Sequence, residues 1–199
     1  MEDFNLEMPD INSAFAQLLT GNTTEEEELS LEIPDDYSLI LLMGLDESGK
    51  TSLINNYVYH ESFKPPPTGL LDHSKYNHNG EQLIIREIGG RYRFRDDWPT
   101  LYDNAVALIW VVDMIDRGRI IESREEFEKV LNHESIKNLP ILIILNKIDS
   151  RIKMSRETCE EFLQISQLLE GRQYEIIETT SKTCENLKEG FDWLCSKIP

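Results

Sequence analysis

A phosphate-binding loop between a strand and a helix constrains this chain more than any other feature of its sequence. Residues Gly44–Thr51 read Gly-Leu-Asp-Glu-Ser-Gly-Lys-Thr and match the pattern G-x-x-x-x-G-K-[ST]. The apolar run Tyr37–Met43 before them predicts a buried strand, and Thr51–Tyr59 after them predicts the start of a helix. In this setting successive backbone N–H groups point at phosphate oxygens, and the helix N-terminus adds the positive end of its dipole. The sequence therefore predicts a nucleotide-binding site.

Two side chains of this loop carry the chemistry of phosphate binding. Lys50 would reach the β- and γ-phosphates of a nucleotide, and the hydroxyl of Thr51 would bind Mg²⁺. An accidental Gly-rich turn is the alternative, and the strand and helix that flank the loop argue against it. The residues of this segment that we expect at the nucleotide are Gly44, Asp46, Glu47, Ser48, Gly49, Lys50, Thr51 and Ser52.

The length and composition of the chain fit one domain. At 199 residues with 40% hydrophobic content, the chain can bury a core of its own, and none of its apolar runs is long enough to cross a bilayer. The N-terminus is acidic and lacks the features of a signal peptide. The three cysteines, Cys159, Cys184 and Cys195, lack the spacing of a metal site. These features predict a cytoplasmic protein with reduced thiols.

Acidic residues dominate the chain and gather at its N-terminus. The formal net charge is −17, and residues 1–36 contain eleven acids and no Lys or Arg. Nucleic acid is therefore an unsuitable partner, because phosphate contacts need clustered Lys and Arg, and anionic membranes are disfavoured for the same reason. We expect residues 1–36 to form an extension with a short amphipathic helix from about Asp10 to Gly21. A nucleotide-binding domain should follow at residues 37–199.

From Tyr37 onward, apolar runs typical of strands alternate with helical patterns. The expected strands are Tyr37–Met43, about Leu70–Asn77, Gln82–Glu87, Val106–Asp113, Ile141–Asn146 and Tyr174–Thr179. The expected later helices are near Arg93–Asp103, Arg119–His133, Arg156–Leu169 and Asn186–Ile198. Asn79-Gly80 is a hairpin signal, so the second and third strands should be antiparallel. The pattern predicts an α/β fold in which a six-stranded, mostly parallel sheet carries helices on both faces, and ligands bind beyond the carboxyl ends of its strands.

The run Asn146-Lys147-Ile148-Asp149 follows a predicted strand and narrows the base to guanine. The Asp149 carboxylate can accept hydrogen bonds from N1–H and the exocyclic amine of guanine, whereas adenine lacks that pair of donors. Asn146 would tie neighbouring loops together near the base, and the stem of Lys147 would pack on its face. The segment Thr180-Ser181-Lys182 follows the last strand, where Ser181 could donate its backbone N–H to guanine O6 and Lys182 would lie beside it.

Two further segments complete the phosphate site. Glu87-Ile88-Gly89-Gly90 ends the third strand, where enzymes of this kind place an acid near Mg²⁺ and a glycine N–H on the γ-phosphate. Thr68 follows three prolines between the first helix and the second strand, so its hydroxyl can join the Mg²⁺ shell. A rigid surface connection is the alternative for this proline segment. The expected metal-binding residues are thus Thr51, Thr68 and Glu87, with Glu87 acting through a water molecule.

From about Tyr37 to its end, the chain resembles the Arf and Arf-like small GTPases. The segments that carry the resemblance are Gly44-Leu45-Asp46, Gly49-Lys50-Thr51, Pro67-Thr68, Gly89-Gly90, Trp98, Val111-Val112-Asp113, Asp116-Arg117, Asn146-Lys147-x-Asp149 and Glu189–Trp193. The resemblance implies the P-loop small-GTPase fold, binding of GTP or GDP with Mg²⁺, and two nucleotide-sensitive switches at about 63–76 and 89–103. It also implies that the GTP form binds protein effectors through these switches.

Departures from the family's pattern bear on hydrolysis. Arg91 follows Gly90, where the family usually carries a Gln that orients the attacking water. Arg has no acceptor, so with Lys50 it could only stabilise charge, and we expect very slow intrinsic hydrolysis. Glu87 replaces the family's Asp and adds a methylene near Mg²⁺, while Glu47 adds a negative charge to the loop unless it points to solvent. Both changes predict weaker or more Mg²⁺-dependent nucleotide binding.

The N-terminus also departs from an Arf-type membrane switch. Residue 2 is Glu2 instead of the Gly that N-myristoylation requires, and the apolar stripe of the expected N-terminal helix has no basic face. We therefore expect no stable lipid anchor. The leading hypothesis is an Arf-like switch with slow or impaired hydrolysis that recruits protein effectors. The alternative is a pseudo-GTPase scaffold subunit of a larger trafficking, ciliary or cytoskeletal assembly, and a nucleotide kinase is disfavoured because no lid or acceptor site is evident.

Overall fold

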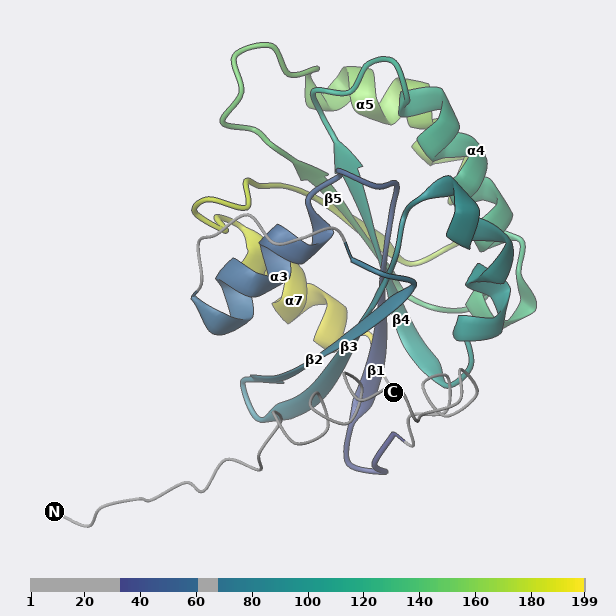
Figure 1. Ribbon diagram of the computed structural model, residues 1–199, viewed down its shortest axis with the longest axis vertical. Helices are drawn as coiled ribbons and strands as arrows, with labels where there is room; N and C mark the ends of the chain where they lie inside the picture. The colour runs from purple at the N-terminus through teal and green to yellow at the C-terminus, as the bar shows by residue number, and fades with distance from the viewer. Residues whose placement is uncertain (1–32, 61–67, 199) are drawn as a thin grey trace, which may run out of the picture. The chain divides into compact units, whose positions relative to one another are not determined.

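A six-stranded sheet organises the part of the chain that the computed structural model describes, residues 33–60 and 68–198. Its strands are β1 (Ser38–Met43), β2 (Leu71–His78), β3 (Glu81–Ile88), β4 (Ala105–Asp113), β5 (Ile141–Asn146) and β6 (Tyr174–Glu178). They lie in the order β2-β3-β1-β4-β5-β6 (Figure 1). The β2–β3 pair is antiparallel and every other neighbouring pair is parallel. The predicted sheet is confirmed, and each strand begins and ends within one residue of its expected bounds.

Some expectations fall on residues that are not described. The expected helix from about Asp10 to Gly21 lies outside the described residues, as do the three prolines at 65–67 in the first expected switch. Thr68 is the first residue after that gap.

The turn between β2 and β3 has the geometry that its sequence predicts. Asn79 has a φ of 53° and Gly80 a φ of 102°, which are the two positive values that a type I′ hairpin turn requires. The side chain of Asn77 accepts a hydrogen bond from the Gly80 N–H at 3.1 Å. This turn fixes the antiparallel register in which Asp72 lies opposite Glu87.

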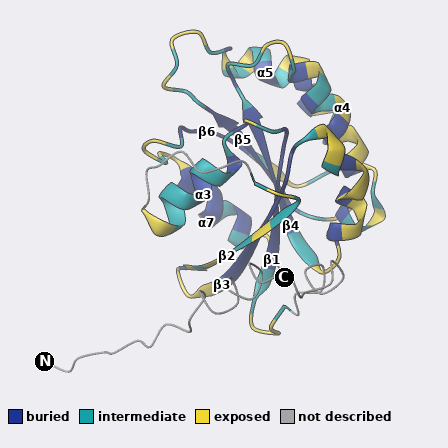
Figure 2. Ribbon diagram, in the orientation of Figure 1, coloured by how far each residue is buried: buried dark blue, intermediate teal, exposed yellow. Residues whose placement is uncertain are grey.

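Helices cover both faces of the sheet and bury its central strand. On one side lie α3 (Lys50–Tyr59) and α7 (Leu187–Cys195), and on the other α4 (Ile120–Leu131), α5 (Arg156–Leu163) and the short α6 (Ile165–Leu168) (Figure 1). Ile40 of β1 belongs to the core under α3 and α7, whereas Leu41 belongs to the core under α4 and α5. Both residues are fully buried, and most of β1 has the dark blue of buried residues in Figure 2. Because both faces of β1 are covered, its sequence is a continuous apolar run.

Two of the expected helices differ from the prediction. The segment expected as a helix near Arg93–Asp103 is a 3₁₀ helix, η1 (Tyr92–Leu101), with Pro99 inside it. Proline cannot donate the hydrogen bond that an α-helix needs at that position, so a continuous α-helix is disfavoured there. The segment expected near Arg156–Leu169 is divided at Gln164, which has a left-handed φ of 53° and ends α5 as a C-cap. The turns before and after it become the separate helices α5 and α6.

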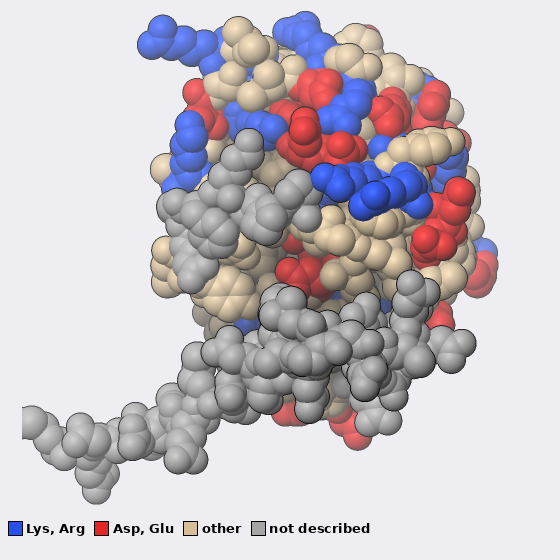
Figure 3. All heavy atoms as spheres, viewed as in Figure 1, with Lys and Arg blue, Asp and Glu red and all other residues tan. Residues whose placement is uncertain are grey.

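Charges of both signs are interspersed on one face of the described residues. On the face in Figure 3, Lys and Arg side chains lie beside Asp and Glu side chains across the upper part of the view. Such interspersed charge does not create the continuous positive field that nucleic-acid backbones require. Among the described helices, none combines the length and apolar character needed to cross a membrane.

Candidate nucleotide-binding site

The loop after β1 is held so tightly by its neighbours that two positions accept only glycine. Gly44 has a φ of 137°, and a Cβ there would lie 2.3 Å from the backbone oxygen of Val111 in β4. Gly49 has a φ of 93°, and its Cβ would lie 2.3 Å from Nδ2 of Asn146. Left-handed backbone and close approach are the two conditions that select glycine. The loop is therefore built against the carboxyl ends of β4 and β5, as the fold predicts.

Lys50 lies under this loop. Its side chain is buried, and Nζ donates hydrogen bonds of 3.1 Å to the backbone carbonyls of Gly44 and Leu45. Burial lowers the pKa of Lys50 to about 8, although the carboxylates of Glu87 and Asp46 oppose that shift. A bound phosphate would favour the charged ammonium by direct attraction. The arrangement thus suits a lysine that becomes fully charged when an anion enters the loop.

Three oxygen-bearing side chains that the sequence assigns to Mg²⁺ meet at one point. The hydroxyls of Thr51 and Thr68 lie 2.7 Å apart, and Oε1 of Glu87 accepts hydrogen bonds from them at 2.5 and 2.9 Å. Burial raises the pKa of Glu87, while Lys50 and the two hydroxyls lower it. One carboxylate with two hydroxyls is the all-oxygen donor set that a hard divalent cation prefers. The residues present therefore fit Mg²⁺.

Asn146 joins the phosphate loop to the predicted guanine loop. Its Nδ2 donates to the carbonyl of Ser48 at 2.8 Å, and its Oδ1 accepts from the backbone N–H of Ser181 at 3.2 Å. Asn56 of α3 supports the same loop, since its Nδ2 donates to the carbonyls of Ser181 and Lys182 at 2.7 and 2.9 Å. Sequence reasoning missed Asn56, because this contact joins residues 125 and 126 positions apart.

The other residues of the predicted guanine site are also brought together. Lys147 has a left-handed φ of 73°, and its Nζ donates to the carbonyl of Glu47 at 2.8 Å and to Oδ2 of Asp113 at 2.6 Å. The carboxylate of Asp149 contacts Nζ of Lys182 at 2.5 Å and the hydroxyl of Thr180 at 2.7 Å. The Lys182 ammonium, followed by that hydroxyl, lowers the pKa of Asp149. Asp149 is therefore ionised at neutral pH and able to accept hydrogen bonds.

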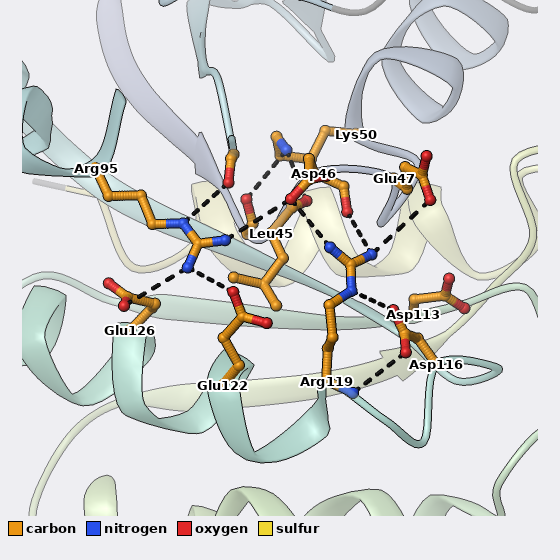
Figure 4. A network of polar contacts seen from close by, with 12 residues as sticks. Leu45, Asp46, Glu47, Lys50, Arg95, Asp113, Asp116, Arg119, Glu122 and Glu126 are labelled. Atoms are coloured by element: carbon orange, nitrogen blue, oxygen red, sulfur yellow. Dashed lines mark hydrogen bonds and ion pairs between the residues drawn. The ribbon is translucent and has the colours of Figure 1, made fainter. Parts of the chain in front are cut away.

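Two arginines that sequence reasoning did not select surround Asp46 (Figure 4). Arg119, the residue just before α4, lies 3.0 Å from Oδ1 of Asp46 and 2.6 Å from Oδ2 of Asp116. Arg95 of η1 is buried, lies 3.7 Å from Asp46 and donates from Nε to the carbonyl of Gly90 at 3.1 Å. A carboxylate inside a loop that binds anions needs a cation beside it. The presence of Asp46 inside a predicted anion-binding loop was therefore a signal in the sequence that a cationic side chain should lie nearby.

The remaining predicted residues lie in the loop or directly beside it. The Glu47 side chain is 82% exposed, and its carboxylate comes no closer than 3.9 Å to Nη2 of Arg119. It therefore points to solvent. Ser48 is buried and its Oγ has no partner among the described residues, while Ser52 lies in the first turn of α3. A Cβ on Gly90 would lie 2.3 Å from the backbone nitrogen of Asp46. The backbone of the second expected switch therefore touches the phosphate loop.

Comparison with known proteins gives consistent matches. The model of a family described as the ADP-ribosylation factor family matches residues 30–198. ADP-ribosylation factor-like protein 5A from Homo sapiens and from Rattus norvegicus is 31% identical over 159 residues, which cover 80% of this chain and 88% of the relative. Among solved structures, the Arl6 BBS3 small GTPase from Trypanosoma brucei with the bound nucleotide analogue GppNp superimposes with a TM-score of 0.74 and 27% identity. That match covers 80% of this chain and 96% of the other.

Proposed function

This chain belongs to the ADP-ribosylation factor family of small GTPases, and from that premise we propose that it is a cytoplasmic guanine-nucleotide switch that hydrolyses GTP very slowly. Members of the family bind guanine nucleotide with Mg²⁺ and act as switches. The proposal of slow hydrolysis rests on the arginine at position 91, where the family usually has a glutamine. Arg91 directly follows Gly90, whose backbone touches the phosphate loop at Asp46. The side chain at this position would thus lie beside the terminal phosphate.

Arginine cannot perform the task that glutamine performs at such a position. Orienting a water for attack requires an acceptor for its proton, and a glutamine amide has both an acceptor and a donor, whereas a guanidinium has donors only. Within the described part of the chain, the Arg91 guanidinium makes no hydrogen bond or ion pair. It is therefore available to contact phosphate charge. Such a contact would stabilise bound GTP and leave the water without an orienting group.

The site contacts support nucleotide binding itself. Lys50 and the backbone N–H groups of Gly49 and Gly90 would hold the phosphates, and bound Mg²⁺ would neutralise part of their charge. The loops carrying Asn146 and Asp149 would hold the guanine. The geometry supports these assignments because each of these residues lies at, or shortly after, the carboxyl end of β1, β3 or β5, where nucleotides bind in sheets of this type.

We expect the GTP form to bind protein effectors and regulators through residues 63–76 and 89–103. The side chain of Tyr92 supports this expectation, because it is 81% exposed and stands between Arg91 and Arg93. Exposed aromatic and arginine side chains are enriched where proteins bind one another.

The nucleotide that accompanies the purified protein tests the proposal. The protein is purified without added nucleotide and denatured, and the released nucleotide is identified by chromatography. We expect GTP from the wild-type protein and mostly GDP from Arg91→Gln. Arg93→Gln, a change two residues further along, is the control and should retain GTP. GDP from the wild-type protein at the level of Arg91→Gln would contradict slow hydrolysis.

A second candidate function is a pseudo-GTPase scaffold that holds no nucleotide. One observation favours it: both carboxylate oxygens of Asp149, which guanine would need, already have partners in Lys182 and Thr180. The same chromatography separates the two functions. A protein that releases no nucleotide and takes up none from solution would support the scaffold.

A further inference from the structure

The carboxylate of Glu87 reaches further into the metal site than a water-mediated role requires. Its Oε1 contacts the hydroxyls of both Thr51 and Thr68, so the three oxygens form one triangle with sides of 2.5, 2.7 and 2.9 Å. We propose that Glu87 binds the nucleotide-associated Mg²⁺ directly, as a third protein ligand beside the two threonines. This inference rests on the proposed nucleotide binding, and not on the proposed slow hydrolysis.

The size of the triangle matches one face of a Mg²⁺ coordination octahedron. Mg²⁺ holds oxygen ligands at about 2.0–2.1 Å with near-ideal octahedral geometry, so that neighbouring ligands lie about 2.9 Å apart. The three side-chain oxygens are separated by 2.5 to 2.9 Å. Shifts of a few tenths of an ångström would therefore place all three around one cation. The opposite face of the octahedron would remain for phosphate oxygens and water.

The backbone of Glu87 is fixed, so the length of its side chain decides where the carboxylate lies. Glu87 pairs with Leu42 of β1 on one side and with Asp72 of β2 on the other. An aspartate at the same backbone position would hold its carboxylate back by about 1.5 Å, the length of one C–C bond. The shorter side chain would leave enough space between the carboxylate and the metal for a bridging water. The longer side chain of glutamate fills that space, and the structure shows its carboxylate oxygen in contact with the hydroxyls of Thr51 and Thr68.

The surroundings of Glu87 also favour a direct ligand. Its side chain is buried, with 6% of the residue exposed, and a buried carboxylate is stable only when it is paired or bound to a metal. Lys50 is the nearby cation that favours its charged form. When Lys50 binds the phosphates of a nucleotide, a directly bound Mg²⁺ would stabilise the charged carboxylate of Glu87 in its place.

Counting the water ligands of bound Mn²⁺ tests the inference. Wild-type protein and Glu87→Asp are loaded with the non-hydrolysable analogue GppNp and Mn²⁺, and the EPR linewidth is compared in ordinary and ¹⁷O-enriched water. We expect the metal in Glu87→Asp to carry one more water than in the wild type. An equal number of waters would overturn direct binding by Glu87.

The Mg²⁺ affinity of the GppNp-loaded protein provides a second measurement. Glu87→Gln keeps the length of the side chain and removes its charge, so Mg²⁺ should bind at least about tenfold more weakly. Glu81→Gln, at the exposed start of the same strand β3, is the matched control and should not change the affinity. Unchanged affinity in Glu87→Gln would also overturn the inference. If the wild-type protein took up no GppNp, both this inference and the proposed nucleotide binding would fail, whereas an equal water count in loaded protein refutes this inference alone.

Discussion

Nζ of Lys182 lies 2.5 Å from Oδ2 of Asp149, the carboxylate that we predict to recognise guanine. The hydroxyl of Thr180 contacts the other carboxylate oxygen at 2.7 Å. Both oxygens that guanine would use thus have partners within the chain. The base must share or displace these contacts when it binds, which makes Lys182 a competitor for the guanine site.

Removing the Lys182 ammonium should therefore tighten nucleotide binding. Lys182→Met keeps an unbranched side chain of similar length and removes the charge. Because the lysine is largely exposed, its ion pair contributes at most about 1 kcal/mol, so we expect GDP to bind up to about fivefold more tightly. Lys188→Met removes a similarly exposed ion pair, with Asp192, and serves as the control in the same calorimetric titration. Weaker binding in Lys182→Met would mean that the ammonium holds the base instead of competing with it.

The base preference of the protein should follow the chemistry of residue 149. Asp149→Asn replaces one acceptor with an N–H donor, which suits xanthine, whose carbonyl stands where guanine has its exocyclic amine. We expect GDP to bind at least about a hundredfold more weakly and xanthosine diphosphate to bind better than GDP. Competition between the two nucleotides measures the preference directly. Unchanged preference for GDP would remove Asp149 from the base site.

The ion pair between Arg119 and Asp46 should stabilise the phosphate loop. Arg119→Ala leaves Asp46 with the more distant Arg95, and because the pair is partly exposed we expect a loss of about 1 kcal/mol, or a melting temperature lower by about 2–4 °C. A double-mutant cycle with Asp46→Asn isolates the pair from other effects. Lys137→Ala removes the exposed pair with Glu134 and should change the melting temperature less. A coupling energy of zero between Arg119 and Asp46 would refute the pairing.

The depressed pKa of Lys50 gives the nucleotide-free protein a definite pH dependence. The pKa falls from 10.5 to about 8 on burial, so between these values the unfolded chain binds more protons than the folded one. The free energy of unfolding should therefore rise with pH from about 8 to about 10.5. Below pH 8 both states are protonated and this contribution becomes constant.

Lys50→Met removes this titration and provides its control. Urea denaturation at pH 7.5 and pH 9.5 should show a larger gain in stability for the wild-type protein than for Lys50→Met. Equal gains in the two proteins would mean that Lys50 keeps its ordinary pKa beneath the loop.

Local patterns in the sequence predict most of the fold. All six strands and the turn at Asn79-Gly80 follow from apolar runs and from residues that accept a positive φ, which are properties of neighbouring residues. The division at Gln164 could not be predicted in this way, because glutamine carries no preference for the left-handed conformation that ends α5. Pro99 was a signal against a continuous α-helix at η1, and the prediction of a helix near Arg93–Asp103 did not take it into account.

The residues of the candidate site also fall into two groups, those that belong to short sequence motifs and those that only the fold brings together. The loop residues and Asp149 belong to short motifs that a single sequence displays. The arginines around Asp46 do not, because Arg119 reaches it across 73 residues and only the folded chain places them together. The three-oxygen contact at Glu87 likewise depends on the registers of β1, β2 and β3.

Single-turnover hydrolysis of GTP tests the central claim most directly. Wild-type protein, Arg91→Gln and the control Arg93→Gln are loaded with radiolabelled GTP and Mg²⁺, and released phosphate is followed over time. Because a group that orients the attacking water contributes factors of about 10² or more, Arg91→Gln should hydrolyse GTP at least about tenfold faster than the other two. Equal rates in the wild-type protein and Arg91→Gln, or a slower rate in Arg91→Gln, would contradict the claim that Arg91 holds this switch in its GTP form.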